Sequence, residues 1–196
     1  MKQYMKKNKV LLLLVLLTII IIIIGIFIPA ILPNKVNKEI NLNIKNLVIQ
    51  IKEKEQLSNT TPYITFIGNI ISTLIIWSLG ISIIGIPIII FYYGLKSLYL
   101  SVEIILLLKN ISQSNILFIL IYSISSLIYL SILFILVYYA CNYSIILIKS
   151  LFMKKEYKIK KITYNYFKIL IITLILITVY SLIEIFVIPK LLRLVI

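Results

Sequence analysis

Long runs of apolar residues recur along this 196-residue chain, and they constrain its fold more than any other feature. Residues 10–32 carry no charged side chain, and a helix of about 20 apolar residues crosses a hydrocarbon core roughly 30 Å thick. The mean hydropathy is +1.12, far above that of a soluble domain. No polar segment is long enough to bury a core of its own. We therefore expect an all-α, polytopic membrane protein.

About five membrane-spanning helices are expected, and they make residues 1–196 a single integral membrane domain. The expected spans cover residues 10–32, 68–94, 97–114, 116–148 and 169–188. Residues 63–108 are too long for one span, and Gly80, Gly85, Pro87 and Gly94 interrupt them. We place the turn of this region at Lys96, which leaves the third span short.

The distribution of lysines predicts the orientation, because cytoplasmic loops carry an excess of Lys and Arg. Residues 1–9 hold four lysines, and the basic loop 149–168 holds seven against one glutamate. Both segments are expected inside, which agrees with four crossings between them. Residues 33–62 then form an outside loop, and the C-terminus lies outside. A basic start before an apolar run is also typical of a secretory signal, but this run exceeds the about 7–15 residues of a signal core, so we expect a retained span.

The composition excludes most catalytic and metal chemistry. The chain has no His and no Asp, and its only cysteine, Cys141, is expected to be a small buried residue. Ser-His-Asp and Cys-His catalysis, cysteine-based metal sites and internal disulfides are therefore impossible within it. A pair of Lys96 with Ser97 or Ser101 remains available, but nothing near it suggests an oxyanion hole. We expect no enzyme activity, no cofactor and no metal.

The formal net charge is +14 at pH 7. In a soluble protein this charge would indicate nucleic acid, and the aromatic residues among the lysines of 149–168 would suit a single strand. Here the lysines lie in short segments between spans, where an anionic leaflet attracts them. We expect membrane lipids as partners and no nucleic acid.

Three ionisable residues interrupt the apolar spans: Lys96, Glu103 and Glu184. A charge near the bilayer centre costs about 2.5–3.5 kcal/mol on insertion scales, so each is a functional candidate. They would form an ion or proton path, or they would be charges near span ends and one packing contact. We favour the second interpretation, because so few groups make a poor relay. Asn69 is expected to bond between helices, and Trp77 to pack in the middle of its span.

Apolar residues recur at helical spacing in the outside loop, which predicts a short amphipathic helix. Its apolar face consists of Ile40, Ile44, Leu47, Val48 and Ile51. This face would bind a partner or lie on a surface, or it would pack back on the membrane domain. The sequence favours neither alternative.

Residues 77–89 read WSLGISIIGIPII, with Asn69 before them and Leu95-Lys96 after them. Near the end of the chain, Ser181-Leu-Ile-Glu184 is followed by Pro189. Both blocks resemble the stage II sporulation protein M family, the first its second span and the second its terminal segment. Two departures occur: Ser97 and Ser101 stand where the family usually has glycines, and the fourth span lacks the prolines of the family.

The resemblance implies a role in endospore formation. Members of that family are membrane proteins of the sporulation septum, and they act when the mother-cell membrane engulfs the forespore. The resemblance implies a non-catalytic scaffold in the bacterial cell membrane, on the mother-cell side of the septum. Its partners would be the peptidoglycan hydrolases of the engulfment complex, stage II sporulation proteins D and P. The residues that it marks are Asn69, Trp77, Gly80, Gly85, Pro87, Lys96, Glu184 and Pro189.

A transporter or permease subunit is the alternative function. Carriers build binding sites from spans that glycine and proline break near the middle of the membrane, and Gly80, Gly85 and Pro87 fit that description. No pseudo-symmetric partner segment accompanies them. The oligomeric state and the role of Glu103 stay open.

Overall fold

The computed structural model of this chain describes residues 9–31, 42, 60–82, 84–110, 116–152 and 159–195. Within these ranges the regular structure is entirely α-helical, which confirms the all-α fold class. The helices are α2 (Lys9–Ile31), α4 (Thr60–Gly80), α5 (Gly85–Asn110), α6 (Ile116–Phe152), α7 (Ile159–Phe186) and α8 (Ile188–Val195).

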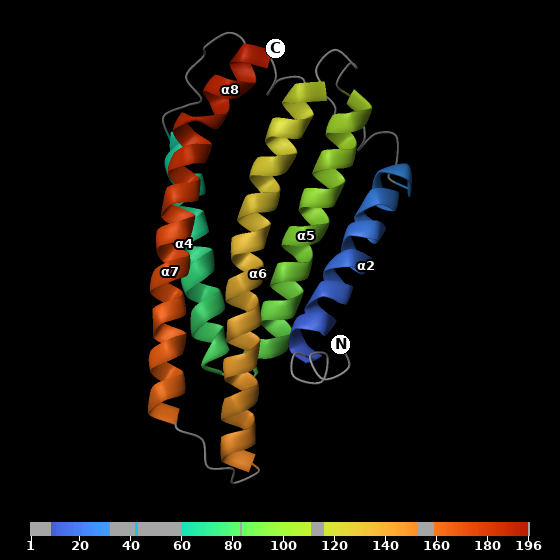
Figure 1. The fold of residues 1–196 in the computed structure, drawn as a ribbon. Coiled ribbons are helices and arrows are strands. Elements are labelled where there is room, and N and C mark those ends of the chain that lie inside the picture. Colours follow the sequence, from blue (N-terminus) through green and yellow to red (C-terminus); the bar gives the residue numbers. More distant parts are fainter. Residues whose placement is uncertain are drawn as a thin grey trace, which may run out of the picture.

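Four stretches of the described chain are helical, long and apolar enough to cross a membrane: Lys9–Ile31, Gly85–Lys109, Ile116–Phe152 and Ile159–Leu192. The apolar part of α4, Ile64–Gly80, is shorter. Figure 1 shows that α2 ends at one end of the bundle and that α5 begins at the other end. Helix α4, which lies between them in the chain, therefore runs back along the bundle in the direction opposite to α2. The chain is therefore a polytopic membrane protein whose five long helices alternate in direction.

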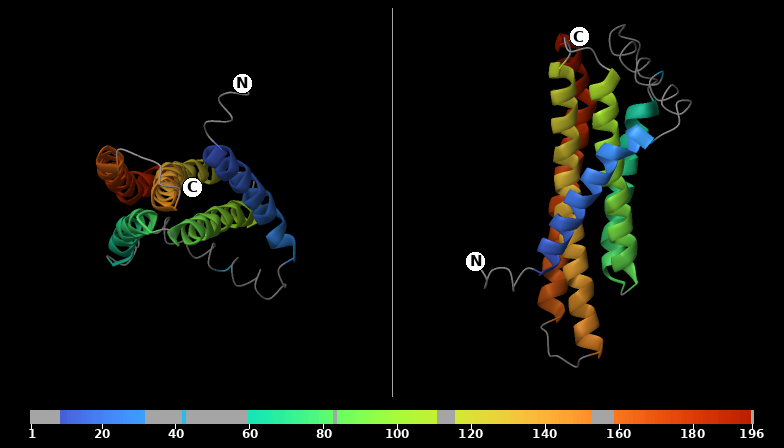
Figure 2. Two further views of the ribbon diagram at one scale, coloured as in Figure 1. Left: turned by 90° about the horizontal axis from the view of Figure 1, so that it is seen from below. Right: turned by 90° about the vertical axis from the view of Figure 1, so that its right-hand side faces the viewer.

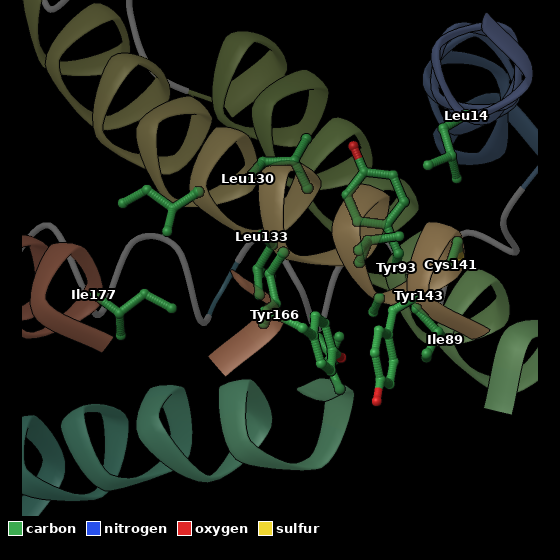
Figure 3. Packing of buried hydrophobic residues seen from close by; sticks show 14 of the residues in the cluster. Leu14, Ile89, Tyr93, Leu130, Leu133, Cys141, Tyr143, Tyr166 and Ile177 are labelled. Atoms are coloured by element: carbon green, nitrogen blue, oxygen red, sulfur yellow. The ribbon is translucent and has the colours of Figure 1, made fainter. Parts of the chain in front are cut away.

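Helix α6 lies in the middle of the bundle and contacts each of the other described helices. Figure 2 shows α2 crossing α5 on one side of it, with α4 and α7 on the other side. Leu133, Leu136 and Val137 of α6 are fully buried. Figure 3 shows this packing, with Leu14 of α2 beside Tyr93 of α5. Large apolar side chains cover the outer faces, where lipid tails would surround them.

The expected turn at Lys96 is wrong. Helix α4 ends at Gly80, Ile81 and Ser82 begin a turn, and α5 continues without interruption from Gly85 to Asn110. Pro87 lies in the first turn of α5, where its missing N–H costs nothing because that group has no partner within the helix. The spans expected at 68–94 and 97–114 are therefore replaced by α4 and α5, and the third span is not short.

The basic segment 149–168 is also more helical than expected. Helix α6 continues to Phe152, and α7 begins at Ile159 instead of 169. Helix α7 begins before the expected residue because Tyr166 is buried and packs on Tyr143 of α6. At the other end of α7, Pro189 is the second residue of the short helix α8.

The predicted orientation can be tested by cysteine labelling. In a Cys141→Ala background, a cysteine at Ser58 is expected to react with a membrane-impermeant maleimide on intact cells, because residues 33–62 are assigned outside. A cysteine at Met153 is expected to react only after the cells are permeabilised. Cys141 is 2% exposed, so the unmodified protein serves as the unlabelled control. The opposite pattern would invert the orientation.

Candidate polar cavity within the bundle

A polar cavity of about 360 Å³ lies between four helices. Its lining comes from Thr65 and Asn69 of α4, Lys96, Tyr99, Leu100 and Glu103 of α5, Tyr122, Ser126, Tyr129 and Leu130 of α6, and Tyr180 and Glu184 of α7. These residues belong to the half of the bundle where α5 ends and α6 begins (Figure 1). In the predicted orientation this is the outer half. All three ionisable residues that interrupt the spans thus line one cavity.

Glu103 finds its partner on another helix. The Tyr122 hydroxyl of α6 donates a hydrogen bond of 2.5 Å to Glu103 Oε1. A charge-assisted hydrogen bond is stronger than one between neutral groups, so it stabilises the Glu103 carboxylate in surroundings that hold little water. Glu184, on α7, interacts with the hydroxyl of Tyr180, one helical turn earlier. Glu184 thus lies in the cavity wall together with Glu103.

Lys96 is held in the middle of α5 by an aromatic ring. Its Nζ lies 5.9 Å from the centroid of the Tyr92 ring, within the range of a cation–π interaction. The Tyr92 hydroxyl in turn donates a hydrogen bond of 2.7 Å to Ser72 Oγ of α4. The lysine ammonium therefore has a defined environment inside the span, although the helix has no break there.

Asn69 and Lys96, which flank the first resembling block, meet residues of the second block at this cavity. Asn69 Nδ2 donates a hydrogen bond of 3.3 Å to Ser181 Oγ, which joins α4 to α7 across 112 residues of sequence. The prediction that Asn69 bonds between helices is confirmed. Lys96 and Glu184, also marked by the resemblance, line the same cavity. Residues that are far apart in the chain are thus collected in one place.

One polar atom of the cavity wall has no hydrogen-bond partner. The Tyr129 hydroxyl oxygen is buried and unpaired, while its ring lies 5.5 Å from the ring of Tyr180. Buried polar groups are usually hydrogen-bonded, so this hydroxyl is an exception among the residues around the cavity.

Trp77, Gly80, Gly85 and Pro87 lie at the opposite end of the bundle, around the turn between α4 and α5, where side chains of α6 and α7 hold the end of α4. Ser144 of α6 donates a hydrogen bond of 2.5 Å to the Gly80 carbonyl. The Tyr166 hydroxyl donates one of 2.8 Å to the Trp77 carbonyl. The rings of Trp77 and Tyr166 stack at 5.6 Å, and Tyr143 stacks on Tyr166 at 4.3 Å (Figure 3). Trp77 therefore packs, as expected, but near the end of its helix and not at mid-span.

Sequence reasoning found part of the cavity and missed the rest. It singled out Asn69, Lys96, Glu103 and Glu184, but the aromatic members were not identified. Tyr122, Tyr129 and Tyr180 carry no signal of their own, because tyrosine is common in this chain, with 14 copies. The seven-residue spacing of Tyr122 and Tyr129 on one helix face was the available hint. The loop face Ile40, Ile44, Leu47, Val48 and Ile51 lies outside the described residues.

The cavity offers charge and hydrogen bonds, not metal ligation. Within the described ranges, no three His, Cys, Asp or Glu residues gather as a metal site would require. Two carboxylates, one ammonium and several phenol groups can hold a polar ligand or exchange protons. Cys141 is buried, as expected, and it is not among the residues that line this cavity. Comparison of the chain with protein-family models, with curated proteins and with solved structures gives no match.

Proposed function

We propose that this protein is a membrane scaffold of the sporulation septum, related to stage II sporulation protein M, that anchors peptidoglycan hydrolases during engulfment. The observation that carries the proposal is that residues flanking the first resembling block meet the second block. Asn69 donates a hydrogen bond to Ser181, and Lys96 lines the same cavity as Glu184. The first block itself lies at the other end of the bundle, around the end of α4 and the start of α5.

The chemistry of the chain supports a scaffold role. The sequence has no His and no Asp, so the hydrolytic work would fall to partner proteins. Long apolar faces remain on the outside of the bundle, for example at Ile75 of α4 and Ile175 of α7. Such faces suit lipid contact or packing against the membrane anchor of a partner.

The scaffold proposal predicts which substitutions release the hydrolases. Replacing Leu47 and Ile51 by Asp is expected to abolish co-purification of the hydrolases with tagged protein from sporulating cells, because it places two charges on the apolar loop face. The matched control is Asn46→Asp with Gln50→Asp, which adds the same charge to other positions of the segment. Mass spectrometry of the two pull-downs gives the result. Equal recovery from both variants would exclude this face as the docking surface.

Transport is a second candidate function, and the cavity favours it. Ionisable residues inside spans commonly mark substrate or proton pathways, and here three of them line one cavity. The break at Gly80, Gly85 and Pro87 does not contribute, since it forms the turn at the end of the bundle. The variant Glu103→Gln separates the two functions: a scaffold keeps its hydrolase partners, whereas a carrier loses coupled uptake.

A further inference from the structure

Anchoring of partner proteins does not require an ionisable cavity inside the bundle, so the cavity calls for a function of its own. Its lining carries two carboxylates, Glu103 and Glu184, and one ammonium, Lys96. With all three ionised, the wall has a net charge of −1. An uncompensated carboxylate is costly in such surroundings, and one additional positive charge would balance it.

The geometry points to a binding site for a primary ammonium group carried by a small organic molecule or a lipid headgroup. The carboxylates of Glu103 and Glu184, from different helices, line the space. A primary ammonium has three N–H donors, enough to reach both carboxylates. The rings of Tyr122 and Tyr180 line the same space, and aromatic faces attract cations.

A bare metal ion fits this cavity less well than an organic cation. Calcium-type ions take six to eight oxygen ligands, and the described residues offer no group of three metal-binding side chains. The volume of about 360 Å³ is an order of magnitude above the roughly 30 Å³ that one water occupies. The space therefore accommodates an ammonium together with the organic group that bears it.

Lys96 determines which part of the cavity an ammonium group would occupy. It precedes Glu103 by seven residues, so the two side chains are rooted about 10 Å apart along α5. Its positive charge repels a bound ammonium and keeps it at the end of the cavity formed by the two carboxylates. Removing this charge should tighten ammonium binding, whereas removing a carboxylate should weaken it.

The test measures thermal stabilisation of the purified full-length protein in phosphatidylglycerol nanodiscs, without any partner protein. Propylammonium chloride is expected to raise the unfolding midpoint saturably, above the effect of equal concentrations of sodium chloride or tetramethylammonium chloride. Glu103→Gln and Glu184→Gln should each weaken the apparent affinity about tenfold or more, the usual range for a hydrogen bond to a charged group. Lys96→Gln should strengthen it, and Lys109→Gln, an exposed lysine on the same helix, should not change it.

A second arm separates the two sources of the ammonium group. Nanodiscs that contain phosphatidylethanolamine are expected to give the same carboxylate-dependent stabilisation if a headgroup enters the cavity, and this outcome supports the lipid source. Equal shifts with sodium or tetramethylammonium would overturn the proposal, as would a propylammonium effect that Lys96→Gln leaves unchanged. Because Lys96→Gln is expected to tighten binding, its result holds even if a glutamate variant fails to fold. Failure here leaves the hydrolase pull-down unaffected.

Discussion

Replacing Gly85 by alanine is expected to destabilise the folded protein by about 3 kcal/mol, at the upper end of the usual cost of overpacking. A Cβ at this position would overlap the Leu79 carbonyl oxygen and lie 2.6 Å from the carbonyl carbon. The obstacle is backbone, so it cannot move aside as a flexible side chain would. The turn would have to open, and the clamp of Ser144 on the Gly80 carbonyl would open with it.

The single tryptophan reports on this turn directly. Trp77 stacks on Tyr166 and meets Phe167 edge-on, so its fluorescence should change as the turn opens. Denaturant unfolding in detergent micelles, followed by Trp77 emission, gives the loss of stability. Gly68→Ala is the matched control, because a Cβ at Gly68 has no heavy atom within 4 Å. Equal midpoints for the two variants would show that the turn accommodates a side chain.

Gly25→Leu should detach α2 from the bundle, at a cost of about 1–3 kcal/mol in folded-state stability. A Cβ at Gly25 would overlap Ser101 Oγ and lie 2.8 Å from Ser101 Cβ and 3.3 Å from the Leu98 carbonyl oxygen of α5. The close approach of α2 to α5 therefore depends on a glycine facing a serine, as in other contacts between small residues in membranes.

The separation of α2 from α5 can be measured with spin labels in the Cys141→Ala background. Labels at Leu11 and Leu95, both exposed, should give one narrow distance distribution in the native sequence and a longer, broader one in Gly25→Leu. Ile26→Leu, at the neighbouring exposed position, is the control and should leave the distribution unchanged. An unaltered distance in Gly25→Leu would mean that α2 is held by other contacts, such as Thr18 with Tyr93.

The position of the turn shows why some boundaries were not predictable. Residues 63–108 are almost uniformly apolar, so hydropathy marks no boundary within them. Lys96 is the one charged residue of this stretch before Glu103, and for that reason the sequence favours a turn there. In the structure, Lys96 is accommodated inside α5 by the Tyr92 ring and the cavity. The turn instead lies where Ser144 and Tyr166, from distant helices, hold the end of α4.

The same distinction applies to the site. The cost of burying an ionisable group depends on that residue alone, and this is why Lys96, Glu103 and Glu184 were identified as candidates from the sequence. Whether they stand apart or share a cavity depends on the rotation and packing of four helices. Since the apolar outer faces are nearly equivalent in composition, the sequence pattern does not predict which face of each helix turns inward.

The sequence by itself determined the membrane class and the all-α fold, and it excludes catalytic sets that need His or Asp, because these follow from the kinds of residues and from the lengths of apolar runs. Only the tertiary structure decided that Asn69 and Ser181 bond, that three ionisable groups line one cavity, and that Gly80 and Gly85 border a clamped turn. Hydropathy is a sum over neighbouring residues of the chain, whereas a cavity is formed by side chains of helices that are far apart in the sequence.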